Sequence, residues 1–400
     1  MVRRLSTAAL AALFGAALAL TPEPLSAQTV RIGLINSYTG FVAEAADQAQ
    51  KGIDLYVKEH EKDLPAGIKI EIIRRDDTSK PDVGKRLAQE LITRDHVQLL
   101  AGVILSPSAA AIAPLTAQAK VPLVLCAAAA GVAIPRISPY VVRVSFTLWQ
   151  QAYPIGKWAA EQGWKTAYTA VTDFIAGHDA EAAFSKAFTD AGGKIIGADR
   201  FPPANPDFTP FVQRIKDAKP DVAFIFVPAG TQATAMMRAI KDLGLREAGI
   251  KIATTQDLLP DEELPNMGDA PLGMISAGTY SVAGKRPANE AFLKVWNRAY
   301  GSKAIPDFFS VDGWDGMNMI FDLIKSTKGV FTADQAMAFF KDWKDPDSPR
   351  GPIAIDPSTR DIIQNVYIRR VEKVDGRLAN IEIATIPMVK DPWKELNPQK

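Results

Sequence analysis

The polar residues of this sequence offer few sets that could perform catalysis. The chain contains three histidines, His60, His96 and His178, and a single cysteine, Cys126. It has no phosphate-binding loop, no dinucleotide-binding fingerprint, no nucleophile elbow and no pair of histidines at zinc-binding spacing. A hydrolase triad needs a nucleophile, a base and an orienting group, and these histidines provide no credible base for one. We therefore expect no catalytic residues, no cofactor and no metal site.

Two loops instead carry groups that suit the binding of a small anion. One predicted strand ends in Asn-Ser-Tyr-Thr-Gly at 36–40, and another ends in Ser-Pro-Ser at 106–108. Each loop precedes a predicted helix, where free backbone N–H groups attract a carboxylate and hydroxyls add donors. Ligands of open α/β sheets bind beyond the carboxyl ends of the strands. The same serines are also ordinary helix caps, so both interpretations stay open at this point.

The elements that position these loops alternate between strand and helix. In the first half, apolar periodicity predicts strands at 30–36, 68–75, 97–103 and 121–126 and helices at 43–62, 81–95 and 107–119. The pattern restarts with a helix at 149–162, strands at 166–171, 194–200, 221–227 and 250–254, and helices at 179–191, 208–218 and 231–243. Further helices are expected at 287–300 and 311–325, and the segment 353–386 is β-rich. Such alternation predicts parallel sheets with helices on both faces, and 400 residues suffice for two domains of similar size.

The first residues have the composition of a secretory signal peptide. Arg3 and Arg4 precede an apolar run over 8–20, and Leu-Ser-Ala at 25–27 resembles a cleavage site. The apolar run is short for a membrane span, and an uncleaved anchor is the alternative. We expect residues 1–27 to be removed near Ala27 and the mature chain to act in the periplasm without entering the membrane.

Composition narrows the partners and the redox chemistry. The formal net charge is +1 and no basic run stands out, so we expect no nucleic acid partner. A single cysteine excludes an intramolecular disulfide. Cys126 lies in an apolar run that reads Val-Pro-Leu-Val-Leu-Cys-Ala over 121–127, which favours a buried thiol over a reactive one.

Several short motifs, in their order along the chain, resemble the type I periplasmic solute-binding proteins. Within that group the chain is similar to the branched-chain amino-acid branch of ABC-transporter substrate-binding proteins. No one motif is specific, but their order from residue 31 to residue 316 is. The motifs are Arg-Ile-Gly-Leu-Ile at 31–35, Ser-Tyr-Thr-Gly at 37–40, Asp-Asp-Thr at 76–78, the stretch 102–108, Asp-Phe at 173–174, the stretch 205–211, Gly-Leu at 244–245 and Gly-Trp-Asp-Gly at 313–316.

The resemblance implies an architecture and a mechanism. It implies two Rossmann-like lobes with parallel sheets, joined by a three-strand hinge. The first lobe would comprise 28–147 and 279–352, and the second 148–278 and 353–400. A small ligand would be captured in the cleft between the lobes by hinge closure, with no chemical step. The implied partner is a membrane permease with its ATPase, and we expect the chain to be a monomer.

The resemblance also implies which residues hold a ligand carboxylate, and here the sequence departs from the amino-acid binders. Ser106, Ser108 and the backbone at Ala127 and Ala129 would hold the carboxylate, with Ala129 in place of a threonine. Gln256 stands where those binders have an acidic residue for the ligand ammonium. A buried ammonium without a counter-charge is costly, and glutamine offers only hydrogen bonds.

The expected ligand follows from this lost charge and from nearby aromatic residues. Aromatic side chains expected at the cleft are Tyr38, Phe146, Trp149, Phe174 and Phe309, although some of them would pack in the core or hinge. We therefore favour an aromatic carboxylate, such as a benzoate or cinnamate derivative. If Asp257 or Asp173 supplies the missing charge, a branched-chain amino acid or an amide is the alternative. A receptor sensor module and a secreted α/β hydrolase are the competing classes, and no signalling domain or triad supports them.

Overall fold

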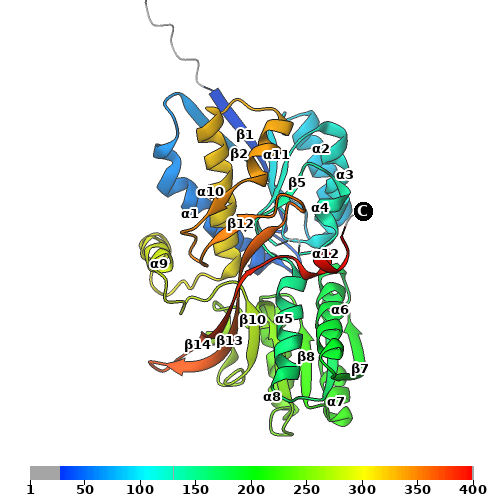
Figure 1. The fold of residues 1–400 in the computed structure, drawn as a ribbon. Coiled ribbons are helices and arrows are strands. Elements are labelled where there is room, and N and C mark those ends of the chain that lie inside the picture. The colour runs from blue at the N-terminus through cyan, green and yellow to red at the C-terminus, as the bar shows by residue number, and fades with distance from the viewer. Residues whose placement is uncertain (1–27, 129, 399–400) are drawn as a thin grey trace, which may run out of the picture.

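The computed structural model describes residues 28–128 and 130–398, which form two α/β lobes, one above the other in Figure 1. The predicted signal peptide (1–27) and the predicted ligand residue Ala129 lie outside the described residues. The two-lobed α/β architecture with parallel strands, predicted from the alternation of apolar strands and amphipathic helices, is confirmed. None of the described helices is both long and apolar enough to cross a bilayer.

The upper lobe in Figure 1 is built on a five-stranded parallel sheet in the order β2-β1-β3-β4-β5. Its strands are β1 (Gln28–Asn36), β2 (Ile68–Asp76), β3 (Leu99–Gly102), β4 (Leu123–Leu125) and β5 (Val141–Arg143). Its helices are α1 (Ala43–His60), η1 (Glu61–Asp63), α2 (Pro81–Thr93), α3 (Ser106–Ala119), α4 (Ile134–Ile137), α9 (Pro287–Tyr300), α10 (Phe308–Thr327) and α11 (Ala333–Lys341). Helices on both faces explain why the central strands are apolar throughout.

Late helices complete this first lobe. Helix α10 lies along α1, and Gly52 of α1 makes the close approach possible. A Cβ at Gly52 would lie 1.8 Å from the backbone oxygen of Ser310. At Gly316, a Cβ would lie 2.1 Å from the Cβ of the fully buried Cys126. The expectation of a buried thiol is thus confirmed, and burial raises its pKa to about 12.

The lower lobe has a parallel core in the order β7-β6-β8-β9-β10, extended by antiparallel strands. The parallel strands are β6 (Thr166–Thr172), β7 (Lys194–Phe201), β8 (Val222–Phe226), β9 (Lys251–Thr255) and β10 (Ile275–Gly278). The antiparallel strands are β11 (Lys344–Asp345), β12 (Ile353–Ile355), β13 (Ile362–Val374) and β14 (Arg377–Val389). The helices are α5 (Leu148–Glu161), α6 (Ile175–Asp190), α7 (Thr209–Ala218), α8 (Thr231–Asp242), η2 (Gln256–Leu258), η3 (Leu264–Met267) and, at the junction of the lobes in Figure 1, α12 (Pro392–Leu396).

Three connections join the lobes: from β5 to α5, from β10 to α9, and from β12 into the long strand β13. At the last of these, β12 pairs with β13 of the lower sheet. Its side chains Ile353 and Ile355 nevertheless pack in the core of the upper lobe. Sheet pairing therefore assigns β12 to the lower lobe, whereas core packing assigns it to the upper lobe. The predicted lobe boundary at residue 353 stays a prediction.

Candidate ligand-binding site

A small pocket lies between the two lobes, close to the carboxyl ends of several strands. From the upper lobe it is lined by Val42, Ala45, Ile104, Leu105, Ser106, Ala128, Ala130, Phe146 and Phe309, and from the lower lobe by Leu148, Phe174, Ala176, Phe226, Pro228, Ala229 and Asp257. Within this lining only Ser106 and Asp257 have polar side chains. The cavity is thus an apolar space with one polar side chain on each lobe.

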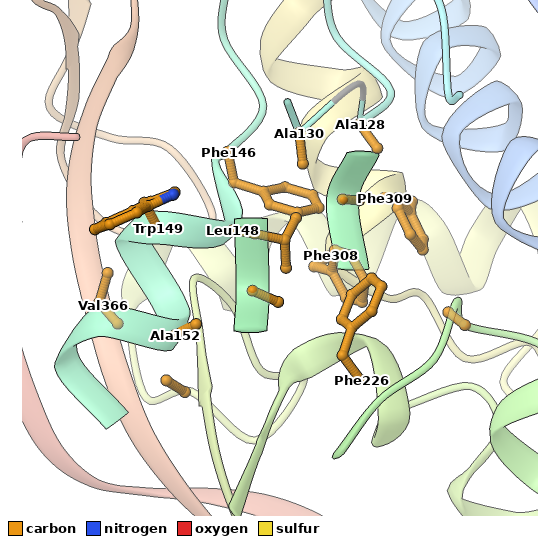
Figure 2. Close-up of a cluster of buried hydrophobic side chains, with 14 of the residues drawn as sticks. Ala128, Ala130, Phe146, Leu148, Trp149, Ala152, Phe226, Phe308, Phe309 and Val366 are labelled. Carbon is orange, nitrogen blue, oxygen red and sulfur yellow. The ribbon is translucent and has the colours of Figure 1, made fainter. Parts of the chain in front are cut away.

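Four phenylalanines dominate the lining. Phe146 and Phe309 of the upper lobe have ring centroids 6.3 Å apart, and Phe174 and Phe226 of the lower lobe are 6.1 Å apart. Figure 2 shows Phe146, Phe309 and Phe226 grouped together, with Ala128 and Ala130 on the side away from Phe226. Aromatic rings around a small apolar space favour a ligand that is itself an aromatic ring.

The polar group of the upper lobe is the start of helix α3. The helix begins at Ser106, has proline in its first turn and has no acidic residue there. The first N–H groups of a helix have no partner within the helix and carry the positive end of its dipole. The Ser106 hydroxyl oxygen accepts a hydrogen bond from the Gly131 N–H at 3.2 Å, which leaves its own proton to donate. This corner of the cavity is suited to a carboxylate.

A buried ion network holds the loop that faces α3. Arg143 is fully buried and donates to the Gly131 carbonyl oxygen at 2.5 Å and to Asp361 Oδ1 at 2.7 Å. The side-chain nitrogen of Lys394, on helix α12, contacts the other carboxylate oxygen of Asp361, and burial together with the charge of Arg143 lowers the pKa of Lys394 to about 6. Both backbone polar groups of Gly131 are therefore bonded, its N–H to Ser106 at the start of α3 and its carbonyl oxygen to Arg143 of this network. These bonds hold Gly131, the residue next to the lining residue Ala130, in place.

The polar group of the lower lobe is Asp257, in the turn that follows β9. Its side chain is 6% exposed, and Thr255 Oγ1 donates to its Oδ2 at 2.9 Å. Burial raises the pKa of Asp257 to about 7, partly offset by the bond from Thr255 and by the charge of Arg369. The preceding residue, Gln256, faces another way, because its Oε1 accepts a hydrogen bond from the Thr279 N–H at 2.7 Å.

Contacts across the cleft show that the two lobes are closed on each other. Phe41 of the upper lobe packs edge-on against Phe174 of the lower lobe, with centroids 6.2 Å apart. The Val132 N–H of the upper lobe donates to Asp179 Oδ2 of the lower lobe at 3.0 Å. A ligand in the cavity would therefore contact both lobes, as capture by closure requires.

The structure brings together four of the ten residues predicted to bind the ligand. Ser106, Phe146, Phe174 and Phe309 all line the cavity. Their contact with a ligand stays a prediction, because the placement shows only that they share one space. Sequence reasoning did not single out Phe226, although it ends strand β8 and the rule that ligands bind beyond strand ends pointed to this position.

Five of the predicted residues do not line the cavity: Tyr38, Ser108, Ala127, Trp149 and Gln256. The Tyr38 hydroxyl donates to Gln50 on α1. Ser108 lies in the first turn of α3 itself and is fully buried. Ala127 is fully buried in the core, one residue before the lining residue Ala128. Adjacent residues of the same loop can therefore differ, with one lining the cavity and the next buried in the core.

The remaining aromatic residue and the second carboxylate are also placed elsewhere. Trp149 stacks on Tyr153, with centroids 6.1 Å apart, and Figure 2 shows it away from the Phe146 group, near Val366. Asp173 is more than half exposed and pairs with His178, whose Nε2 lies 2.6 Å from Asp173 Oδ1. Of the two carboxylates that sequence reasoning offered as a counter-charge, only Asp257 lines the cavity.

Comparison with known proteins decides the family. Residues 29–377 match the family described as Periplasmic binding protein. The chain belongs to this family. A "Leu/Ile/Val-binding protein homolog 6" from Brucella melitensis is 39% identical over 381 residues, which cover 94% of this chain and 96% of that protein. The predicted membership is thereby confirmed.

Solved structures of solute-binding proteins of ABC transporters are also similar to this chain. One, from Rhodopseudomonas palustris BisB5 in complex with 3,4-dihydroxybenzoic acid, is 47% identical with a TM-score of 0.87, and the match covers 92% of this chain and 99% of that one. Another, from R. palustris in complex with 4-hydroxybenzoate, is 40% identical with a TM-score of 0.87, covering 93% and 100%. These solute-binding proteins share the family and the two-lobed fold of the present chain.

Proposed function

We propose that this chain captures a small aromatic carboxylate of the benzoate class in the periplasm and delivers it to the permease and ATPase of an ABC transporter. One observation carries the proposal: four phenylalanines surround a cavity that has a helix N-terminus on one lobe and a single carboxylate on the other. The aromatic acids bound by the two R. palustris proteins support the same ligand class.

The proposed role involves binding and closure and no chemical step. The ligand carboxylate would bind first at the start of α3, and its ring would then contact Phe174 and Phe226 of the lower lobe. Only contacts that exist in the closed form can favour closure, because a ligand shifts an equilibrium by its differential affinity for the two states. The closed form would then be the one that the permease recognises.

A branched-chain amino acid is the second candidate, and one observation favours it. Asp257 is a buried carboxylate in the lower lobe and could pair with the ammonium of an amino acid whose carboxylate lies at α3. The Brucella relative carries a Leu/Ile/Val-binding name. Against it, four aromatic rings in the lining match a flat aromatic ligand better than a branched aliphatic one.

A thermal-shift screen separates the two candidates. The protein is unfolded and refolded to remove bound ligand, then heated with benzoates, cinnamates, leucine, isoleucine, valine and amides. A ligand at a hundredfold excess over its dissociation constant adds about 2.7 kcal/mol to the free energy of unfolding, which shifts the melting temperature measurably. We expect shifts with benzoates and none with amino acids. A shift with leucine alone would replace the proposed ligand class.

Replacing Ser106 by alanine is expected to weaken benzoate binding by about tenfold or more, because hydrogen bonds to charged groups contribute about 1.5–3 kcal/mol. Ser108→Ala is the matched control, since Ser108 belongs to the same helix but does not line the cavity. We expect its affinity to stay within about twofold of the wild type. Calorimetric titration measures both. Equal losses in the two variants would remove Ser106 from the carboxylate site.

Closure should also depend on pH through Glu262 of the lower lobe. Burial and the carboxylates of Asp307, Glu263 and Asp47 raise the pKa of Glu262 to about 9 from a usual value of 4.5, and Lys51 offsets this only in part. Asp307 and Asp47 belong to the upper lobe, so this environment exists only when the lobes are closed. Closure therefore binds a proton in the range between the two pKa values.

The sign of the effect follows from this proton uptake. A group whose pKa is higher in the closed form favours closure at low pH, and the advantage is lost as pH rises toward about 9. Benzoate affinity is expected to fall at least about threefold between pH 6 and pH 8.5. Glu262→Gln should reduce that dependence, and the remainder comes from Asp257 and Asp307, whose pKa values are also raised into this range, whereas Glu290→Gln, at an exposed position on α9, should keep all of it. A pH profile identical in all three proteins would contradict the assignment.

A further inference from the structure

The two polar side chains of the cavity belong to different lobes and have different chemistry. Ser106, at the start of α3, offers donors to an anion. Asp257, in the lower lobe, offers a carboxylate, which accepts hydrogen bonds. A ligand that spans the cavity would therefore present an acceptor to the upper lobe and a donor to the lower lobe. A benzoate without a substituent has only the acceptor.

Asp257 lacks a full set of donors within the protein. Thr255 Oγ1 bonds Oδ2, and the residue's own backbone N–H also favours the ionised form. No other described residue donates to Oδ1. The nearby cation, Arg369, is fully buried and committed elsewhere, since it donates to Ser276 Oγ at 3.0 and 3.2 Å and to the Tyr280 carbonyl oxygen at 2.6 Å.

A carboxylate that is 6% exposed and faces a cavity is costly when it lacks a donor. Leaving a buried acceptor unsatisfied costs more free energy than a satisfied hydrogen bond contributes, and sites built around such groups reject ligands that cannot pair with them. Of the other lining residues only Ser106, on the opposite lobe, has a polar side chain, and its hydroxyl lies at the carboxylate corner beside α3. We therefore expect a group of the ligand to supply the donor for Asp257 Oδ1.

We infer that Asp257 is a specificity-determining residue that accepts a hydrogen bond from a ring hydroxyl remote from the ligand carboxylate, so that the site prefers hydroxybenzoates over benzoate. This inference rests on the proposed function. The carboxylate at α3 directs the opposite edge of the ring toward the lower lobe, between Phe174 and Phe226 and Asp257. A phenolic hydroxyl on that edge is a donor without a charge, so it meets the carboxylate without the desolvation cost of an ammonium.

The experiment compares two ligands in each protein, so that a general loss of stability cancels. Dissociation constants for benzoate and 4-hydroxybenzoate are measured by calorimetry with the wild type, Asp257→Ala and Asp257→Asn. Asp173→Asn is the matched control, because it removes a carboxylate of the same lobe that does not line the cavity. Asp257→Asn keeps the shape of the side chain if the alanine variant does not fold. Leucine is titrated into the wild type alongside.

At pH 8, above the Asp257 pKa of about 7, we expect the wild type and Asp173→Asn to prefer 4-hydroxybenzoate by at least about tenfold, since a hydrogen bond to a charged group is involved. Asp257→Ala should reduce that preference to about threefold or less, mainly by weakening 4-hydroxybenzoate, and Asp257→Asn should fall between them because its amide oxygen still accepts a weaker bond. An unchanged preference in the Asp257 variants, or no preference in the wild type, would overturn the inference. Binding of leucine with no binding of either benzoate would instead overturn the proposed function.

Discussion

Replacing Asp361 by asparagine is expected to lower the free energy of unfolding by about 3–5 kcal/mol. Asp361 is 1% exposed and contacts two buried basic side chains, Arg143 at 2.7 Å and Lys394. Asparagine keeps the shape but removes the carboxylate that pairs with Arg143. The fully buried guanidinium would then lose this partner, which is the costly outcome when one member of a buried ion pair is removed.

A second substitution tests this explanation. Burial and the charge of Arg143 lower the pKa of Lys394 to about 6, so Lys394 is a cation below that pH. At pH 5, Asp361→Asn combined with Lys394→Met should therefore recover part of the lost stability, because the second cation beside Arg143 is gone. Side chains in one network couple, and the double-mutant cycle measures that coupling. Urea unfolding of ligand-free protein gives the free energies. If the double variant were less stable than the sum of the single losses, the charge argument would fail.

An ion pair at the surface provides a control for the size of the expected loss in free energy of unfolding. Arg200 donates to Glu181 Oε2 at 2.9 and 2.7 Å, but the Arg200 side chain is 48% exposed. Water screens such a pair, so Glu181→Gln should cost less than about 1 kcal/mol. Asp361→Asn and Glu181→Gln each remove one negative charge that is hydrogen-bonded to an arginine, and burial is the main difference between the two sites. Similar losses in the two variants would mean that the buried network contributes little.

Much of the fold was predictable because each element carries its own periodic signal. The helix predicted at 287–300 has the same bounds as α9, and the helix predicted at 43–62 differs from α1 only at its end. Helices α11 and α12 were not predicted, although both begin with capping residues. Thr332 forms a capping box with Gln335, and Asp391 precedes a proline. Closer attention to these caps would have found both short helices.

The site was predictable where position in the fold decides it. Phe146, Phe174 and Phe309 flank elements that end at the cleft, and all three line the cavity. The prediction failed at neighbouring positions where the conformation of a turn decides which way a side chain points. Gln256 and Asp257 follow the same strand in a 3-10 turn, where successive side chains point to different sides, and only Asp257 reaches the cavity. Spacing in the sequence does not reveal which of the two faces inward.

Long-range ion pairs could not be predicted in this way. Arg143 and Asp361 are 218 residues apart along the chain, and nothing in their local sequence marks them as partners. Their pairing follows from the return of the chain through the hinge, which places the start of β13 beside the end of β5. Periodicity describes which face of an element is buried, but it does not identify the charge that another segment brings to that face.

Replacing Ala229 by phenylalanine is expected to weaken benzoate binding by at least about a hundredfold. Ala229 lies in the loop after β8, lines the cavity and is 4% exposed in the closed form. At the next residue, a Cβ on Gly230 would lie 2.9 Å from Glu44 Oε2 of the upper lobe, so this loop already presses against α1. A phenyl ring would fill the ligand space, and overpacking alone costs about 1–3 kcal/mol.

Ala229→Phe should block closure on the ligand without affecting the folding of either lobe. In the open form the added ring would face the cleft, away from the core of either lobe, so the melting temperature of the ligand-free protein should change little. Ala191→Phe adds the same ring at an exposed position at the end of α6 and should bind benzoate like the wild type. Small-angle scattering should show the wild type becoming more compact with benzoate and Ala229→Phe remaining unchanged. Undiminished binding by Ala229→Phe would mean that the ligand lies outside this cavity, because the ring and the ligand cannot occupy the same space.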